Sequence, residues 1–222
     1  MLQPALFRAN SSTVTMYPDD QREGGGVSVE TVRVEVRPAH DFDDMATMFA
    51  PKNPESSVCW CLSWRLSSKE NRELTGTARA DKVRELCSRE LAPGVLAYMD
   101  ENVVGWAGVA PRAELHPFAT SKKIPHIDEL PVWSIWCLRV RPGFRKHGIT
   151  PALIDGAVEY ARASAAPVVE SYPVDNAGQK VDLTMAFVGT RSMFERAGFT
   201  KAADTTSVVG GFPRILMRRM LG

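Results

Sequence analysis

Residues 132–163 read VWSIWCLRVRPGFRKHGITPALIDGAVEYARA, and this stretch decides the fold. Its first nine residues are apolar almost throughout, which predicts a central strand covered on both faces. Its last thirteen residues place alanines, Leu153 and Tyr160 on one side at helical spacing, while Asp155 points away. Strand, loop and helix in this order predict a crossover unit, whose parallel partner strand is PVVESYPV at residues 167–174.

The loop inside this unit is suited to binding phosphate. A helix start leaves its first main-chain N–H groups unpaired at the positive end of the helix dipole. Gly148 allows a ligand close to the backbone, and Arg145 and Lys146 add positive charge beside it. Pro151 has no N–H, so the donors are expected from residues 147–150. These residues alone predict a site for a diphosphate.

The composition restricts the partners. The chain has 222 residues, with 27 Lys and Arg against 26 Asp and Glu and a formal net charge of +1. A near-neutral chain has no overall attraction to nucleic acid or to anionic lipid, so neither is expected as a partner. The four cysteines come without a secretory signal, and no apolar run is long enough to span a membrane, so a cytoplasmic location is expected.

The N-terminal segment differs from the rest of the chain. Residues 1–29 lack apolar periodicity and include three consecutive glycines, which predicts a flexible leader; a mitochondrial-type targeting peptide is the alternative. One domain is expected over residues 30–222. It begins with a strand that alternates valines with charged residues up to Pro38, and Asp41 is placed to cap a helix ending at Phe49.

The middle of the chain is expected to add a helix, a hairpin and a long connection. The helix should run from Gly76 to about Leu91 with two distinct faces. The expected buried face consists of Val83, Leu86, Cys87 and Leu91, and the expected solvated face of Arg79, Lys82, Arg84, Arg89 and Glu90. Residues 94–111 predict two strands joined by a tight turn, and the irregular connection at residues 111–131 predicts a binding loop.

The C-terminal part is expected to complete the sheet. A short helix over residues 190–197 is closed by Gly198, which is the usual glycine signal at the end of a helix. Two last strands are expected around residues 201–209 and 214–220.

The phosphate loop also carries a family signature. Arg145, Gly148 and Thr150 follow a strand with the spacing Arg, two residues, Gly, one residue, Gly or Ala. In this loop, and in the motif MFERAGF at residues 193–199, the chain resembles the GCN5-related N-acetyltransferase (GNAT) superfamily. The resemblance covers roughly residues 32–221. It implies an α/β fold of the α+β kind, with a mixed, mostly antiparallel, twisted sheet flanked by helices.

The resemblance implies an acyl donor and an acceptor. Acetyl-CoA would be the donor, and an amine acceptor would attack its thioester directly. The pyrophosphate is expected on the loop formed by Arg145, Lys146, His147, Gly148, Ile149 and Thr150. The main chain of Leu138, Arg139 and Val140 is expected to pair with the pantetheine arm. No metal is implied, and the resemblance is compatible with a homodimer.

Two positions depart from the pattern of the superfamily. Thr150 stands where Gly or Ala is usual, and its hydroxyl is expected to cap the helix or to hydrogen-bond the ligand. Phe194 lies at a cofactor-side position where the superfamily often has a Tyr that protonates the leaving thiolate. A phenyl ring has no proton to donate, so Tyr172 on the neighbouring strand is the substitute donor.

Three further features bear on the acceptor side. Glu170 is a charged residue in an apolar strand, which makes it a candidate general base; a carboxylate paired with a neighbouring Arg is the alternative. Trp60 and Trp64 lie in a segment that borders the acceptor pocket in the order of the superfamily, so they are expected to shape that pocket. Cys59 and Cys61 have no second cysteine pair nearby in the sequence, which favours core packing over a zinc half-site.

Two other functions are weighed against an acyl-CoA-dependent N-acyltransferase. Phe194 and the lack of an unambiguous base also fit a CoA-binding regulatory or interaction module with little or no turnover. A nucleotide-binding protein would use the same loop, but the chain lacks the Gly-Lys-Ser/Thr of a P-loop and the three-glycine dinucleotide fingerprint. The acceptor amine, whether a small molecule or a protein lysine, is not identified by these residues.

Overall fold

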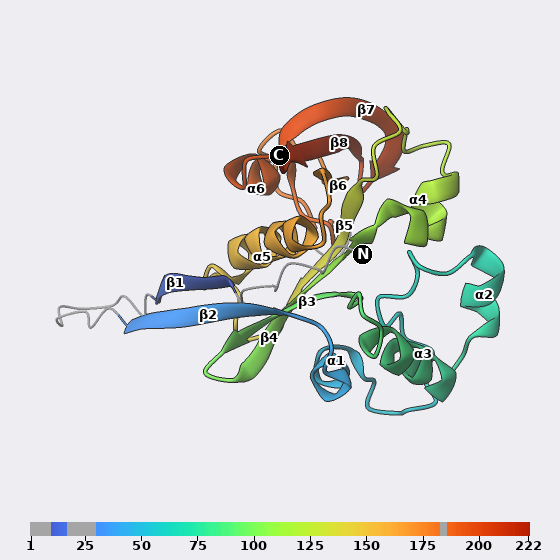
Figure 1. Cartoon of the computed structure of the whole chain (residues 1–222), viewed down its shortest axis with the longest axis vertical. Coiled ribbons are helices and arrows are strands. Elements are labelled where there is room, and N and C mark those ends of the chain that lie inside the picture. The colour runs from blue at the N-terminus through green and yellow to red at the C-terminus, as the bar shows by residue number, and fades with distance from the viewer. Residues whose placement is uncertain (1–9, 17–29, 183–185) are drawn as a thin grey trace.

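A sheet with the strand order β1-β2-β3-β4-β5-β6-β8-β7 runs through the computed structural model, which describes residues 10–16, 30–182 and 186–222 (Figure 1). The strands are β1 (Asn10–Met16), β2 (Glu30–Pro38), β3 (Gly94–Met99), β4 (Asn102–Pro111), β5 (Trp133–Val140), β6 (Val168–Ser171), β7 (Thr200–Val209) and β8 (Phe212–Met220). Neighbouring strands pair antiparallel except β5 and β6, which are parallel. The predicted mixed, mostly antiparallel sheet with flanking helices is confirmed.

Helices cover both faces of the sheet. The helices are α1 (Phe42–Phe49), α2 (Ser68–Glu73), α3 (Thr77–Cys87), α4 (His116–Thr120), α5 (Ile149–Ala163) and α6 (Arg191–Arg196), with a 3-10 helix at Arg112–Glu114. α5 lies on one face, and α1 and α3 lie on the other (Figure 1). Each face therefore has its own apolar core, and the sheet separates them.

α5 is the crossover connection that the sequence predicts between β5 and β6. The parallel register runs from Trp133 opposite Val169 to Ile135 opposite Ser171. The apolar residues of α5, Leu153 among them, are buried against the sheet. This arrangement explains why β5 is apolar on both sides, because it lies inside the sheet with helices over both faces.

The start of the chain contains a strand that the sequence analysis did not predict. Within the expected leader at residues 1–29, the described residues 10–16 form β1, which pairs antiparallel with β2 along its whole length. Thr13, Val14 and Thr15 are β-branched, which favours an extended chain. The segment lacks apolar alternation, and this is why it gave no strand signal. The rest of the leader lies outside the described residues.

α3 departs from its predicted faces at two positions. Leu91 is 39% exposed, because the helix ends at Cys87 and does not reach it. Arg79 was expected in solvent, but it is 5% exposed and turns inward. Its guanidinium donates to the carbonyl oxygens of Leu74 at 2.7 Å and Asn71 at 2.6 Å. Carbonyl groups of α2 and of the residue that follows it, which periodicity within α3 cannot reveal, therefore bury this arginine.

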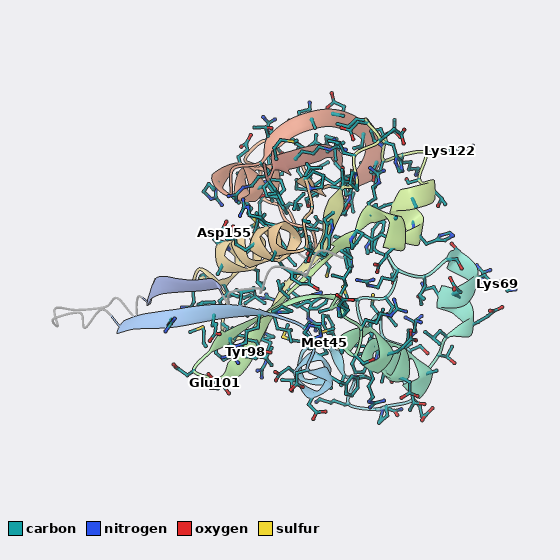
Figure 2. All side chains as sticks on the ribbon, in the orientation of Figure 1. Met45, Lys69, Tyr98, Glu101, Lys122 and Asp155 are labelled. Carbon is teal, nitrogen blue, oxygen red and sulfur yellow. The ribbon has the colours of Figure 1, made fainter. Side chains whose placement is uncertain are left out.

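The hairpin of β3 and β4 matches its prediction and holds α1 in place. Tyr98 on β3 donates its hydroxyl hydrogen bond to Asp44 of α1 at 2.8 Å. Figure 2 shows Tyr98 and Glu101 near the turn end of this hairpin, with Met45 of α1 nearby. Asp41 caps α1 as expected, since its carboxylate accepts from the N–H groups of Asp43 and Asp44.

The C-terminal elements match the predicted helix and strand pair. α6 is followed by Gly198 with φ +77°, and β7 and β8 pair antiparallel beside β6. No helix in residues 10–16, 30–182 or 186–222 is long and apolar enough to cross a membrane.

Candidate active site

The loop between β5 and α5 presents a row of unpaired main-chain donors, residues 145–150. Gly148 caps α5 in the left-handed conformation, with φ 68° and ψ 6°, which glycine adopts without the cost that a Cβ brings. The helical hydrogen bonds begin with the Ala152 N–H, which donates to the Gly148 carbonyl at 3.3 Å. Among the described residues, no acceptor takes the N–H groups of residues 145–150. A row of free N–H groups at the start of a long helix is suited to an anion.

The side chains of this loop divide into charged and anchoring groups. Arg145 and Lys146 are exposed, and neither forms an ion pair with any other residue that the structure describes. His147 is partly buried, and Ile149, at 2% exposed, anchors the helix start in the core. Thr150 is the second residue of α5, and the cap is Gly148. Capping by Thr150 is therefore excluded, and its hydroxyl is left for a ligand.

β5 and β6 stop pairing before β5 ends. Their parallel register ends where Ile135 lies opposite Ser171. Further along β5, the Leu138 N–H donates to the carbonyl of Phe187 at 2.8 Å instead of to β6. The Leu138 N–H, which was expected to pair with pantetheine, is thus hydrogen-bonded to another residue of the protein.

The remaining main-chain groups of this part of β5 alternate between two sides. The Arg141 N–H donates to Val104 on β4 at 2.9 Å. Since N–H groups alternate along a strand, Arg139 also faces β4, whereas Val140 faces the same side as Leu138. Nothing in the described part of the chain accepts the Val140 N–H. Of the three residues, Leu138 and Val140 therefore face the side where the strands have separated.

Glu170 is completely buried and is surrounded by donors. Its Oε1 accepts from Arg112 Nη1 at 2.9 Å, from Ser134 Oγ at 3.2 Å and from the Tyr172 hydroxyl. Its Oε2 accepts from Arg218 Nε at 3.1 Å. Both oxygen atoms are engaged, and two arginines balance the charge. These surroundings match the alternative considered from the sequence, in which Glu170 is a carboxylate paired with arginine and not a general base.

The same charged network ties the connection at residues 112–131 to the sheet. Arg112 Nη2 also donates to the carbonyl oxygens of Phe118 and Ile124, both at 3.3 Å. Arg218 on β8 pairs with Asp128, and this hydrogen bond lowers the pKa of the Asp128 carboxyl. The connection is therefore held by buried arginines.

Tyr172, the residue after β6, lies beside Glu170. Its hydroxyl donates to Glu170, and its ring packs against Phe118 with a centroid distance of 4.6 Å. Burial, together with the negative charge of Glu170, raises the pKa of Tyr172 well above its ordinary value. A pKa this high keeps the proton on the hydroxyl across the neutral range, and it also makes Tyr172 a weaker acid than an ordinary tyrosine.

Phe194 packs as a core residue. It is fully buried, and it meets Phe199 edge to face with a centroid distance of 5.1 Å. It belongs to the core on the α5 side of the sheet.

The two tryptophans expected at an acceptor pocket lie in different surroundings. Trp64 stacks on Phe118 at 4.5 Å and lies 6.2 Å from the Phe187 ring, centroid to centroid. Trp60 is 5% exposed and stacks on Phe42 at the start of α1. The structure therefore brings Trp64, but not Trp60, to the aromatic cluster that contains Tyr172.

Sequence reasoning missed three buried arginines near these residues. Arg112 and Arg218 hold Glu170, and Arg214 donates to the Tyr172 carbonyl at 2.7 Å. Arg214 lies 5.0 Å from the Phe187 ring centroid, and burial lowers its pKa. A usable signal was present, because Arg214 and Arg218 interrupt a strand that is otherwise largely apolar.

The fold and the loop together define an α/β protein whose strand, loop and helix at the centre of a mixed sheet present main-chain N–H groups suited to an anion. A family model for the acetyltransferase (GNAT) family matches residues 46–180. The chain belongs to this family. Among curated proteins, none matches the sequence.

Solved structures resemble this chain at low sequence identity. The crystal structure of an acetyltransferase is 17% identical, with a TM-score of 0.50, over 84% of this chain and 99% of that one. PaiA N-acetyltransferase from Thermoplasma acidophilum, in complex with coenzyme A, is 14% identical, with a TM-score of 0.45, over 84% and 98% of the chains. The yncA protein from Salmonella typhimurium, with its cofactor acetyl-CoA, is 16% identical, with a TM-score of 0.47, over 85% and 94%.

Proposed function

We propose that the protein transfers an acyl group, acetyl in the first instance, from acetyl-CoA to a primary amine. The observation that carries this proposal is the row of unpaired N–H groups at residues 145–150, with the unpaired cations Arg145 and Lys146 beside it. A pyrophosphate is the kind of anion that such a helix start binds. Family membership supports an acyl-CoA donor, and two structural neighbours hold coenzyme A or acetyl-CoA.

The donor would lie along the open side of β5. Its pyrophosphate would occupy the row at residues 145–150, and its pantetheine arm would run past Val140 toward Leu138. Bound acetyl-CoA supplies a thioester that an amine can attack directly. For the arm to pair with Leu138, the Phe187 carbonyl has to give up its hydrogen bond.

The acceptor would approach from the face that carries α1, α3 and the connection at residues 112–131. Trp64, Phe118 and Tyr172 form an aromatic cluster on that face. We assign Trp64 to the edge of the acceptor pocket. Trp60 is buried against α1 and would act on the pocket only through this packing.

Two residues would handle protons on that side. We assign Tyr172 as the candidate donor to the leaving thiolate on the place of its hydroxyl beside Glu170, and not on its pKa, which is raised. Glu170 fixes the Tyr172 hydroxyl and is saturated with donors, so we give it a positioning role. In kinetics, Tyr172→Phe should lower kcat more than it raises KM, because the ring and its packing are kept.

Isothermal titration with acetyl-CoA and with CoA tests the donor site. Gly148→Val should weaken binding by about tenfold or more, which corresponds to about 1.4 kcal/mol, because a branched side chain would crowd the donor row. Gly143→Val is the matched control: Gly143 also has positive φ, in the same loop, but no atom lies within 4 Å of an added Cβ. Wild-type protein that binds neither ligand would overturn the proposal.

The alternative is a CoA-binding module without turnover, and it is favoured by the buried Phe194 in place of a tyrosine. Both functions predict CoA binding, so product formation separates them. A panel of amines and peptides incubated with acetyl-CoA and followed by mass spectrometry should give an acetylated product. Binding without product across a broad panel would favour the module.

A further inference from the structure

One buried arginine of β8 lacks a counter-charge. Arg214 is 6% exposed, and it forms no ion pair with any carboxylate in the described part of the chain. Burial is what lowers its pKa, and no neighbouring carboxylate acts against this effect. A buried cation without a counter-charge costs free energy, so Arg214 is expected to serve something other than stability.

The other buried arginines of the described residues are satisfied by the protein. Arg112 and Arg218 both pair with Glu170. Arg79 has no ion pair there, but Nε, Nη1 and Nη2 all donate to oxygen atoms of the chain. Arg214, by contrast, makes one hydrogen bond, from Nη1 to a main-chain carbonyl at 2.7 Å.

The rest of the Arg214 guanidinium is open to a ligand. Its Nε and Nη2 donate to no acceptor among the described residues, and neither atom is sealed from solvent, whereas the Nε atoms of Arg65 and Arg112 are. The planar fork of a guanidinium matches the two oxygen atoms of a carboxylate. A carboxylate would therefore supply both the missing acceptors and the missing negative charge.

Arg214 lies on the acceptor face of the sheet. Side chains alternate along a strand, so Arg214 shares a face with Leu216, which belongs to the core that Trp64 packs against. The guanidinium lies over the ring of Phe187, 5.0 Å from its centroid, and this ring is 6.2 Å from that of Trp64. Both rings belong to partly buried residues, so a ligand can approach them from solvent.

Phe187 connects this position with the proposed path of the donor. Its carbonyl accepts from the Leu138 N–H at 2.8 Å, and its ring lies under Arg214. The proposed pantetheine arm runs toward Leu138, so the thioester and the guanidinium would lie on two sides of one residue. A small molecule whose amine and carboxylate are a few bonds apart can reach both.

We propose that the acceptor is a small amine that also carries a carboxylate, such as an amino acid, and that Arg214 binds this carboxylate. The inference rests on the proposed acyltransferase function and names the substrate class of that site. A single arginine without a second cation beside it suits a carboxylate better than a phosphate group, which carries more negative charge.

The transfer balances with the carboxylate unchanged. The nitrogen of the acceptor forms a bond to the acyl carbon, and the C–S bond of the thioester breaks. The acceptor starts as an ammonium group and loses two protons, one to the leaving thiolate and one to solvent. The products are an N-acyl amino acid and CoA.

Steady-state kinetics with matched amines test the assignment. Phenylalanine and phenethylamine differ in the carboxylate, and both carry a ring that suits the aromatic cluster. For the wild type, kcat/KM should be about tenfold higher or more for phenylalanine, which corresponds to about 1.4 kcal/mol, because phenethylamine lacks the charge-assisted hydrogen bonds. Leucine with 3-methylbutylamine, and lysine with cadaverine, extend the comparison to other side chains.

Variants of β8 separate Arg214 from the intrinsic reactivity of the amines. Arg214→Met should abolish the preference and should still fold, because no carboxylate loses its partner. Arg214→Lys should recover part of it, since the charge is kept and the fork is lost. Arg219→Met is the matched control: Arg219 lies on the other face of β8, where it pairs with Asp155 of α5, so the preference should remain.

A readout without turnover distinguishes this inference from the acyltransferase proposal. The Arg214 Nε–H signal in the nitrogen–proton correlation NMR spectrum of the full-length protein, assigned from its loss in Arg214→Met, should shift with phenylalanine but not with phenethylamine when CoA is present. A shift without any acetylated product would support the carboxylate site and overturn the acyltransferase function.

The opposite results would overturn the carboxylate site alone. They are equal rates of acetylation with and without the carboxylate, together with an unmoved signal, or a preference that persists in Arg214→Met. A larger shift and a faster reaction with phosphoethanolamine than with every amino acid tested would also overturn it, because the site would then recognise a phosphate group.

Discussion

Two buried side chains in this protein, Glu170 and Cys61, are surrounded by hydrogen-bond donors. Glu170 receives two arginines and a tyrosine, so both of its oxygen atoms are occupied. The Cys61 sulfur accepts hydrogen bonds from two indole N–H groups, and these oppose the effect of burial, which by itself raises the pKa of the thiol. In both cases the hydrogen-bond donors around the side chain determine its role in the folded protein.

Replacing Glu170 should therefore affect folding first. Glu170→Gln leaves the buried Arg112 guanidinium without a counter-charge and Arg218 with Asp128 alone, and we expect a loss of about 3 kcal/mol or more in the free energy of unfolding. Urea denaturation measures it. Glu159→Gln, which removes an exposed pair with Arg162, should cost less than about 1 kcal/mol. A Glu170→Gln protein of normal stability with a shifted pH–rate profile would instead favour the general-base role.

The packing of α5 on the sheet depends on a close approach of its backbone. An added Cβ at Gly156 would lie 2.4 Å from Val36 Cγ1 and 2.7 Å from Val36 Cβ on β2. Since no real Cβ tolerates such distances, the helix reaches the sheet here only because the residue is glycine.

Gly156→Ala should consequently destabilise the protein by about 1–3 kcal/mol, although alanine favours the helix by about 1 kcal/mol. Thermal or urea unfolding measures the change. The double variant with Val36→Ala should recover part of the loss, because the two positions share one contact. Stabilisation by the single variant would show that α5 is not held so closely.

The crossover unit of β5, α5 and β6 connects two strands of the sheet, and the separation of β5 from β6 also leaves main-chain groups of β5 facing an open side. Its loop leaves main-chain N–H groups unpaired, and its strand offers Val140 and Leu138, the latter occupied by Phe187. The proposed pantetheine arm would therefore compete with the hydrogen bond from the Leu138 N–H to the Phe187 carbonyl.

Hydrogen exchange should reveal this competition. On adding acetyl-CoA, we expect the amides of residues 145–150 to become protected and exchange around residues 186–189 to change, because the Phe187 carbonyl leaves Leu138. Peptides of β3, at Gly94–Met99, serve as the internal control. Binding with no change at residues 186–189 would place the pantetheine arm elsewhere.

In the whole molecule, two cores lie on opposite faces of one sheet, and each buries ionisable groups in their neutral form. Burial raises the pKa values of Tyr160 and Cys87, to about 12 and about 11. An acid whose pKa is higher in the folded state keeps its proton after the unfolded chain has lost it. Such groups contribute stability at neutral pH that is lost as the pH rises through the folded value.

The free energy of unfolding should accordingly fall for Cys87 between about pH 8.5, where an ordinary thiol titrates, and about pH 11. Cys87→Ala lacks this contribution, so its stability should fall less steeply over the same range. Chemical denaturation at several pH values measures both slopes. Cys61 acts in the opposite direction, but it is present in both proteins and cancels in the comparison. Equal slopes would mean that Cys87 titrates alike in both states.

Local signals were enough to place most elements and the loop. The apolar run of β5, the helical spacing of α5, the cap at Asp41 and the hairpin turn depend on neighbours in the chain, so periodicity and turn chemistry predicted them. β1 was not predicted, because an edge strand without apolar alternation gives no period-two pattern in the sequence. Leu91 was misplaced because the end of a helix is the weakest part of a periodic pattern.

The partners of buried polar groups came only with the folded chain. Glu170 meets Arg112 and Arg218 across sequence separations of 58 and 48 residues, and Cys61 meets Trp136 across 75. Arg79 turned inward for the same reason, since the carbonyl groups that bind it lie outside its own helix, in α2 and the residue after it and in the loop at residues 58–59. Periodicity reports which residues prefer burial, whereas the pairing of strands and the path of loops determine which donor reaches which acceptor.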